Sequence, residues 1–286
     1  MSRTLVEKLL RRLELEPLAE DCFLGATGRG EGRVFGGLLA AQALVAAGRT
    51  VDVGLAHSLH LYFVRGGRHG IPVTWSVTRV RDGYSFALRH VVAEQAGLAI
   101  LTATASFTTK RAGLAHQDAM PVVPDPDGLE DWEDLRVRVL GPDTVRRPDG
   151  PLEVRDCDPE DATPRTGRAA RRRLWMRPRT PMPTTDPLLH AAVLVYGSDR
   201  GLLGAAGRPH GLMWGTGLGA SLDHAVWFHH PIRFDDWVLY DMTSPVAAAG
   251  RGLCHGALFS RAGERLASVA QEGLIRVRRV SPSGAR

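Results

Sequence analysis

Two helix-like segments of the chain carry almost no polar residues, and this feature limits the possible folds more than any other. Residues 34–47 read Val-Phe-Gly-Gly-Leu-Leu-Ala-Ala-Gln-Ala-Leu-Val-Ala-Ala and stop before Gly48, a residue type favoured just past a helix end. Residues 188–196 are nearly as apolar and follow Asp186-Pro187, a typical helix start. A helix without a polar face must be buried on all sides. We therefore predict two central helices, each enclosed by other elements.

Four strand-like runs follow each of these helices, separated by breaks that contain Gly or Pro. The runs after the first helix cover 57–64, 73–81, 86–95 and 98–107, and those after the second cover 219–229, 237–244, 251–260 and 265–278. One buried helix followed by antiparallel strands is an α+β unit, in which the sheet wraps on the helix. The chain is expected to contain two such units.

The two halves also match one another in sequence. At an offset of 165 residues, Tyr62-Phe63 falls on Trp227-Phe228. The same offset pairs Val73 with Val238, Trp75 with Tyr240, and Thr78 with Thr243. With one more residue inserted, Ala96-Gly97 falls on Ala262-Gly263, in the same expected hairpin turn. We infer an internal duplication, and two copies placed side by side would form one long sheet.

The segment between the copies differs in composition. Residues 111–185 are rich in Pro, Asp and Arg, and 121–128 (Pro-Val-Val-Pro-Asp-Pro-Asp-Gly) should not form regular structure. We expect one short helix near 129–137, and the first strand of the second copy is expected to begin at Leu174-Trp175-Met176. The predicted division is an N-terminal repeat at 1–110, a linker at 111–170, and a C-terminal repeat at 171–286.

A short amphipathic helix is expected ahead of the first copy, at residues 4–14. Thr4 and Glu7 form a capping-box pattern. One apolar stripe follows, made by Leu5, Leu9, Leu10 and Leu13. This helix has the single buried face of a surface helix.

Composition limits the partners. The 286 residues are 44% hydrophobic and 23% charged, as in a soluble globular protein, and the three cysteines have no metal-ligand spacing. No signal peptide is recognisable, and no apolar run reaches the ~18 residues of a membrane span, so we expect a cytoplasmic protein without a membrane partner. The net charge is +5, but the arginines are spread among nearly as many acids, and Arg171-Arg172-Arg173 lacks interleaved aromatics. Nucleic acid is therefore not an expected partner.

The motifs of common hydrolases are absent from the sequence. There is no Gly-x-Ser-x-Gly, no His-Glu-x-x-His and no P-loop spacing. The best local imitation of a triad is Ser221, Asp223 and His224. Alternation along a single strand would place Ser221 and His224 on opposite faces, so a serine–histidine pair is not expected there.

Several motifs, in one order over almost the whole chain, resemble the acyl-CoA thioesterase II family. They are Arg-Val-Phe-Gly-Gly (33–37), His-Ser-Leu-His-Leu-Tyr-Phe-Val-Arg (57–65), Arg-Asp-Gly-Tyr-Ser-Phe-Ala-Leu-Arg (81–89), Tyr-Gly-Ser-Asp (196–199), Ser-Leu-Asp-His-Ala-Val-Trp-Phe-His (221–229) and Ala-Gln-Glu-Gly-Leu-Ile-Arg (270–276). The sequence departs most from the family in the linker.

The resemblance implies a double hotdog fold and hydrolysis of fatty acyl-CoA to free fatty acid and coenzyme A. It implies no metal or organic cofactor, acyl-CoA as the substrate partner, and a homo-oligomer. The catalytic Asp of the family matches Asp199, and its Gln matches Gln271. Its third position is Thr or Ser, and Ser221 keeps the hydroxyl there.

Thioester hydrolysis fits these residue types. It needs a water aimed at the carbonyl carbon, a base for the proton of that water, and donors for the developing oxyanion. Asp199 would be the base, and Ser221 with Gln271 would orient the water. Asp199 follows the C-terminal end of the second apolar helix, where the helix dipole disfavours an anion, and this placement suggests a use beyond capping.

The first copy is expected to lack a working site. At the offsets of the duplication, Asp199 falls on Val34, Ser221 on Ala56, and Gln271 on Ala105. One site per chain is therefore predicted, with the first copy providing walls and coenzyme contacts.

Two other functions compete with thioester hydrolysis. A hotdog enoyl-CoA hydratase would need its own acid–base pair, commonly Asp with His, and the sequence shows no such spacing beside the buried helix. A non-catalytic acyl-CoA binding or sensing module would be expected to lose polarity at Asp199 or Gln271, and both residues are present.

Overall fold

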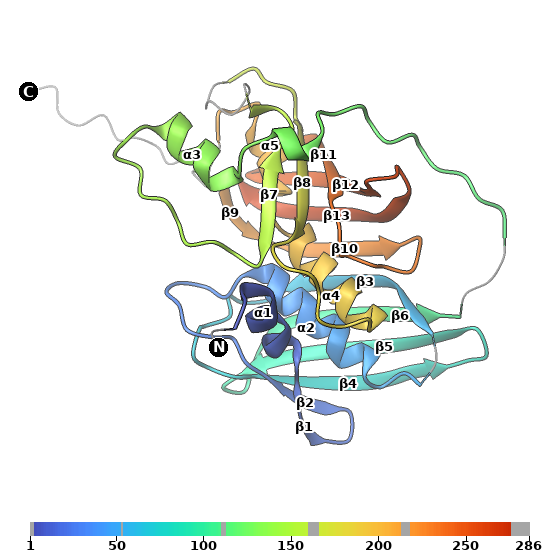
Figure 1. The fold of residues 1–286 in the computed structure, drawn as a ribbon. Helices are drawn as coiled ribbons and strands as arrows, with labels where there is room; N and C mark the ends of the chain where they lie inside the picture. Colours follow the sequence, from blue (N-terminus) through green and yellow to red (C-terminus); the bar gives the residue numbers. More distant parts are fainter. Residues whose placement is uncertain (1–2, 53, 110–112, 160–165, 213–217, 276–286) are drawn as a thin grey trace, which may run out of the picture.

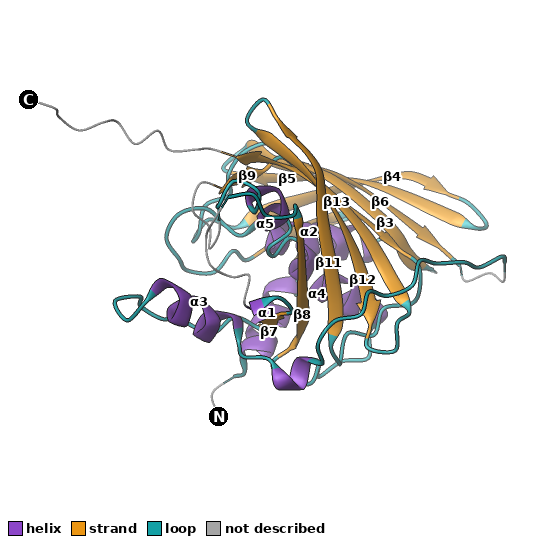
Figure 2. Ribbon diagram, turned by 90° about the horizontal axis from the view of Figure 1, so that it is seen from above, coloured by secondary structure: helices purple, strands orange, loops and turns teal. Residues whose placement is uncertain are grey.

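The computed structural model describes residues 3–52, 54–109, 113–159, 166–212 and 218–275. Within these ranges the strands form one 13-stranded antiparallel sheet, and the central helices pack against one of its faces (Figures 1 and 2). The first half contains α1 (Leu5–Leu13), β1 (Glu16–Ala19), β2 (Cys22–Gly25), α2 (Gly36–Gly48), β3 (Leu55–Phe63), β4 (Val73–Asp82), β5 (Phe86–Gln95) and β6 (Leu98–Thr108). The remainder contains η1 (Pro126–Gly128), α3 (Trp132–Leu140), β7 (Leu152–Asp156), β8 (Arg171–Pro178), α4 (Pro187–Ser198), α5 (Leu203–Gly207), β9 (Leu218–Ser221), β10 (Asp223–Phe228), β11 (Val238–Ala248), β12 (Arg251–Ser260) and β13 (Arg265–Ile275).

The strand order reveals the duplication. It runs β1-β2-β4-β5-β6-β3 and then β10-β13-β12-β11-β8-β7, while β9 pairs with β13. The two lists mirror each other about the join between β3 and β10, whose antiparallel register includes His60 opposite Ala225. The expected α+β arrangement of two repeats in one long sheet is therefore confirmed.

The second repeat begins earlier than the sequence predicted. β8 pairs with β11 and β7 with β8, as β2 pairs with β4 and β1 with β2. Residues 152–156 therefore supply the first strand of the second repeat, although they lie inside the range assigned to the linker (111–170). These strands were missed because short edge strands of four or five residues carry little periodic signal.

α2 and α4 form the centre of the molecule and run antiparallel. A Cβ on Gly37 would meet the Tyr196 carbonyl, whereas a Cβ on Gly48 would meet Leu188, so the start of each helix lies beside the end of the other. Every residue of α2 from Gly37 to Ala47 is buried. Its one polar side chain, Gln42, donates hydrogen bonds to two backbone carbonyls at 2.6 and 3.0 Å. The prediction of two buried helices is thus confirmed.

The smaller predictions have mixed outcomes. The capping box of α1 is present, with Thr4 N donating to Glu7 Oε2 (2.7 Å) and Glu7 N donating to Thr4 Oγ1 (3.2 Å). The short helix of the linker is α3, somewhat later than expected, and η1 occupies the end of a stretch expected to be irregular. The predicted strand end at 276–278 lies outside the described residues. No helix in the described ranges is long and apolar enough to cross a membrane.

Candidate active site

Asp199 is the C-cap residue of α4, and the last turn of that helix is held in place from two sides. The Tyr240 hydroxyl donates to the Ser198 carbonyl (2.7 Å), which satisfies one of the carbonyls left free at a helix end. The Ser198 hydroxyl donates to the Val195 carbonyl (2.9 Å) within the helix. Asp199 therefore projects from a rigid turn at the middle of the molecule.

Two side chains from the strands converge on Asp199. The Ser221 hydroxyl at the end of β9 donates to Asp199 Oδ1 (3.2 Å), and the Gln271 amide of β13 donates to the same oxygen (2.7 Å). Gln271 is only 1% exposed, so its amide depends on such internal partners. The structure thus brings together the three residues that the resemblance singled out, although they are far apart in sequence.

The start of α2 lies on the other side of Asp199. A Cβ added to Gly36 would be 2.9 Å from Asp199 Oδ2, so only a glycine lets the two helices approach this closely. Phe35, the N-cap residue, makes no side-chain hydrogen bond to the helix. The Leu38 N–H donates to the Phe35 carbonyl (3.1 Å), whereas the N–H groups of Gly36 and Gly37 make no backbone hydrogen bond with the described residues. The positive end of the α2 dipole offsets the unfavourable position of Asp199 at the end of α4.

His224 of β10 is a fourth side chain at the site, and the sequence reasoning did not assign it a role. Its ring is fully buried, and its Nε2 is 2.8 Å from the Ser198 hydroxyl, which accepts a hydrogen bond from it. Burial lowers the pKa of His224, while the Asp199 carboxylate acts in the opposite direction, so the ring is neutral near pH 7. Its Nδ1 and Gln271 Oε1 are both buried without a hydrogen-bond partner among the described residues.

The expectation that Ser221 and His224 point to opposite faces is wrong. Residue 222 interrupts the strand, so β9 and β10 are separate and alternation does not carry across them. Both side chains point toward the end of α4, where Ser221 bonds Asp199 and His224 bonds Ser198. No hydrogen bond joins Ser221 to His224 in the described part of the chain, so a serine–histidine pair is still not formed.

The first repeat has a different residue at each equivalent position. The C-cap of α2 is Arg49, which is the true counterpart of Asp199; the match with Val34 is wrong because the helices do not keep the offset of the strands. Leu59 pairs with Ala105 at the positions of His224 and Gln271. Ala56 holds the place of Ser221.

In the first repeat a buried arginine binds a residue that follows the end of α2. Arg89 of β5 is 1% exposed, and its guanidinium donates to the Thr50 hydroxyl (2.8 Å) and the Thr50 carbonyl (2.9 Å) beyond the end of α2. Asp82 pairs with the same guanidinium. The first repeat therefore lacks the polar residues of a second site of this kind, although a cavity of about 200 Å³ lies beside Gly48 and Ala56.

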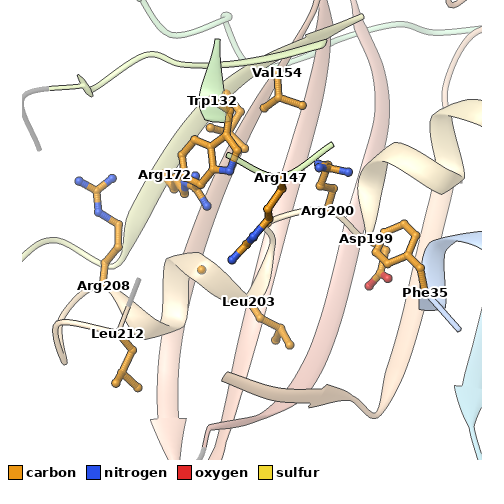
Figure 3. A pocket seen from close by; sticks show the side chains of 13 residues that line it. Phe35, Trp132, Arg147, Val154, Arg172, Asp199, Arg200, Leu203, Arg208 and Leu212 are labelled. Carbon is orange, nitrogen blue, oxygen red and sulfur yellow. The ribbon is translucent and has the colours of Figure 1, made fainter. Parts of the chain in front are cut away.

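Asp199 also lines a cavity of about 310 Å³ next to the end of α4 (Figure 3). Phe35 closes the cavity on the side of the first repeat, and Leu203 of α5 forms part of its floor in this view. Segments from both repeats and from the connecting segment contribute to its walls. A ligand in this cavity would contact the carboxylate directly.

Comparison with known proteins agrees with this geometry. The acyl-CoA thioesterase family matches residues 154–274, and the N-terminal domain of acyl-CoA thioesterases matches residues 26–108. Acyl-coenzyme A thioesterase 8 of Mus musculus is 39% identical, over 93% of this chain and 88% of that protein. An acyl-CoA thioesterase II structure from Mycobacterium marinum is 40% identical with a TM-score of 0.78, covering 98% of this chain and 99% of the other.

A protein with a hot dog fold from Alicyclobacillus acidocaldarius has a TM-score of 0.76 at 20% identity, covering 94% of this chain and 98% of the other, and it shows the fold alone. The protein is therefore a thioester hydrolase with a double hotdog fold. The chain belongs to the acyl-CoA thioesterase II family.

Proposed function

We propose that the protein hydrolyses fatty acyl-CoA to free fatty acid and coenzyme A through a water activated by Asp199. The main support for the proposal is that the two oxygens of the Asp199 carboxylate have different surroundings. Its Oδ1 accepts from Ser221 and Gln271, whereas its Oδ2 lies beside Gly36 at the start of α2, and Asp199 lines the adjoining cavity. One oxygen is thus held in position, and the other is available for the proton of a water.

In the proposed reaction the water oxygen attacks the thioester carbonyl carbon, and Asp199 takes the proton of that water. Gln271 has a second amide hydrogen, and the Ser221 oxygen has lone pairs, so both can also orient the water. The backbone N–H groups at the start of α2 are suited to bind the developing oxyanion. The intermediate then releases the coenzyme A thiolate, which receives the proton from Asp199.

The competing functions have less support. His224 lies beside Asp199, but it is fully buried and bonded to Ser198, so it is not placed to exchange a proton with a substrate as a hydratase would require. A non-catalytic binding module is not proposed, because the family is one of hydrolases.

Replacement of Asp199 tests the proposal. Asp199→Asn keeps the shape of the side chain, but an amide cannot accept the proton. We expect kcat for decanoyl-CoA, measured by release of free thiol, to fall by ~10²–10⁴. Binding of the substrate should persist in equilibrium titrations. Turnover within about tenfold of the unmodified protein would exclude Asp199 as the base.

A further inference from the structure

Four arginines surround the cavity beside Asp199. Arg147 comes from the segment between α3 and β7, Arg172 from β8, Arg200 from the position after Asp199, and Arg208 from the end of α5. Asp199 is the one carboxylate among the lining residues that the structure describes. Figure 3 shows Arg147 between Arg172 and Arg208 on one side and Arg200 with Asp199 on the other. The cavity therefore has a strongly positive wall at the entrance to the reaction centre.

Two of these arginines lie near acids, and a third has no described partner. Arg172 lies 3.5 Å from Asp156, and Arg147 is 4.0 Å from Glu133. The guanidinium of Arg200 makes no hydrogen bond or ion pair with the residues that the structure describes.

Arg172 is buried in a way that a stability role alone does not explain. Its side chain is 8% exposed, its guanidinium stacks 3.9 Å from the Trp132 ring centre, and its Nε is buried without a hydrogen-bond partner in the described ranges. Burial lowers the pKa of Arg172 to about 10, and the charges of Arg208 and Arg200 act in the same direction against that of Asp156. Cations crowded in this manner cost free energy that a bound anion would recover.

We propose that this cavity binds a phosphate group of coenzyme A and so determines that the enzyme acts on thioesters of the coenzyme. The inference rests on the proposed function. Guanidinium groups match phosphate oxygens in charge and geometry, whereas a fatty acyl chain would gain nothing from four cations. The cavity is at the lower end of the ~300–1,000 Å³ of ligand sites, so it accommodates a part of the coenzyme rather than all of it.

The positions of Asp199 and the arginines determine how the substrate would lie in the cavity. The thioester must lie at Asp199, and the phosphate lies among the arginines, so the pantetheine arm runs between them past Phe35 and Leu203. Arg147 belongs to the segment that departs most from the family pattern. That segment therefore acts as part of the coenzyme site and is not merely a connection between the repeats.

The test compares decanoyl-CoA with the decanoyl thioester of pantetheine, which lacks every phosphate. For each protein the ratio of kcat/KM for the two substrates measures the contribution of the phosphates. We expect Arg200→Gln and Arg147→Gln each to lower this ratio about tenfold. A tenfold loss corresponds to ~1.4 kcal/mol, the scale expected when one charge-assisted hydrogen bond to phosphate is removed. The matched control is Arg233→Gln, whose side chain is 82% exposed and pairs with Asp235 away from the cavity.

The inference is overturned if the ratio in both arginine variants equals that of the unmodified protein, or if Arg233→Gln lowers it equally. These results leave the proposed hydrolysis intact. A failure of the proposed function appears differently, as an Asp199→Asn variant that turns over decanoyl-CoA normally.

Discussion

Ser221 and Gln271 both donate to one oxygen of Asp199, and the proposed reaction depends on this difference between a held and a free oxygen. Gln271 is buried and its hydrogen bond is short, so it fixes the plane of the carboxylate. The Ser221 hydroxyl lies 3.2 Å from Asp199 Oδ1, and in the proposed reaction it only orients the carboxylate and the water. A threonine hydroxyl at this position could make the same hydrogen bond.

The role of Ser221 can be separated from that of a nucleophile. Ser221→Thr keeps the hydroxyl and should remain active. Ser221→Ala should lower kcat by ~10–100-fold, the loss expected for a hydrogen bond to a charged group. Mass spectrometry of the protein mixed with substrate should find no acyl group on Ser221. An acylated Ser221 would replace the water mechanism by a covalent one.

His224 links the site to stability. The pKa of His224 is lower in the folded protein than its ordinary value of 6.5. Below pH 6.5 the unfolded chain therefore binds a proton at this ring more readily than the folded protein does. The contribution of His224 to the free energy of unfolding is therefore complete above pH 6.5. It is lost as the pH falls toward the pKa that the ring has in the folded protein. One such proton changes the free energy of unfolding by up to ~1.4 kcal/mol per pH unit.

We predict that His224→Gln, whose amide can still donate to Ser198, makes the free energy of unfolding less dependent on pH between about 5 and 7. Urea denaturation across this range measures the slope. His255→Gln, which alters an exposed ring of β12, serves as the control and should keep the original slope. If His224→Gln left this pH dependence unchanged, the His224 ring would have the same pKa in the folded and the unfolded protein.

At the scale of elements, the close approach of α2 and α4 builds the site between the repeats. The positive end of α2 faces the carboxylate at the end of α4, and Gly36 provides the space for it. Phe35 and Tyr196 lock the contact, with their rings 5.1 Å apart at 75°. Neither helix alone contains both the proposed base and the proposed oxyanion donors.

Gly36→Ala should therefore damage the reaction. The new Cβ would come within 2.9 Å of both Asp199 Oδ2 and Phe63 Cζ, so the carboxylate or the helix must shift. A misplacement of this size should lower kcat/KM by ~10–100-fold, because the reaction depends on geometry near ångström precision. Gly128→Ala adds a Cβ with no neighbour within 4 Å and should leave the kinetics unaltered. Equal kinetics for the two variants would argue against the role of this contact.

At the scale of the whole molecule, the repeats depend on each other. β3 and β10 pair at the join, and α2 and α4 are buried against each other, so separation would expose a sheet edge and a large apolar surface. The proposed catalytic groups come from the second repeat, and the start of α2 comes from the first. Assembly into a homo-oligomer and a cytoplasmic location stay predictions from the resemblance and the composition.

Residues 1–120 and 141–286, produced separately, should each be insoluble or inactive, and co-expression should restore part of the activity. The second fragment starts before β7 because that strand belongs to the second repeat. Sedimentation and thiol release from decanoyl-CoA measure the outcome. A soluble second fragment with near-normal turnover would show that its site is complete without the first repeat.

The sequence alone determined the elements whose signals are local. The unbroken apolar runs of α2 and α4 required buried helices, and period-two patterns identified the longer strands around them, because these patterns depend only on neighbouring residues. The three residues on Asp199 Oδ1 were singled out by resemblance to a family, since no local pattern joins positions so far apart in sequence. The short strands β1, β2 and β7 were missed for lack of length.

Only the tertiary structure decided what surrounds the carboxylate. The break between β9 and β10 turned His224 toward the end of α4, and strand pairing set it beside Gln271. The counterpart of Asp199 was Arg49, because the connection after α4 is longer than that after α2. Arg147 reached the cavity through folding of the connecting segment. Each of these facts depends on contacts between distant parts of the chain, whose geometry is set by packing and not by spacing along the sequence.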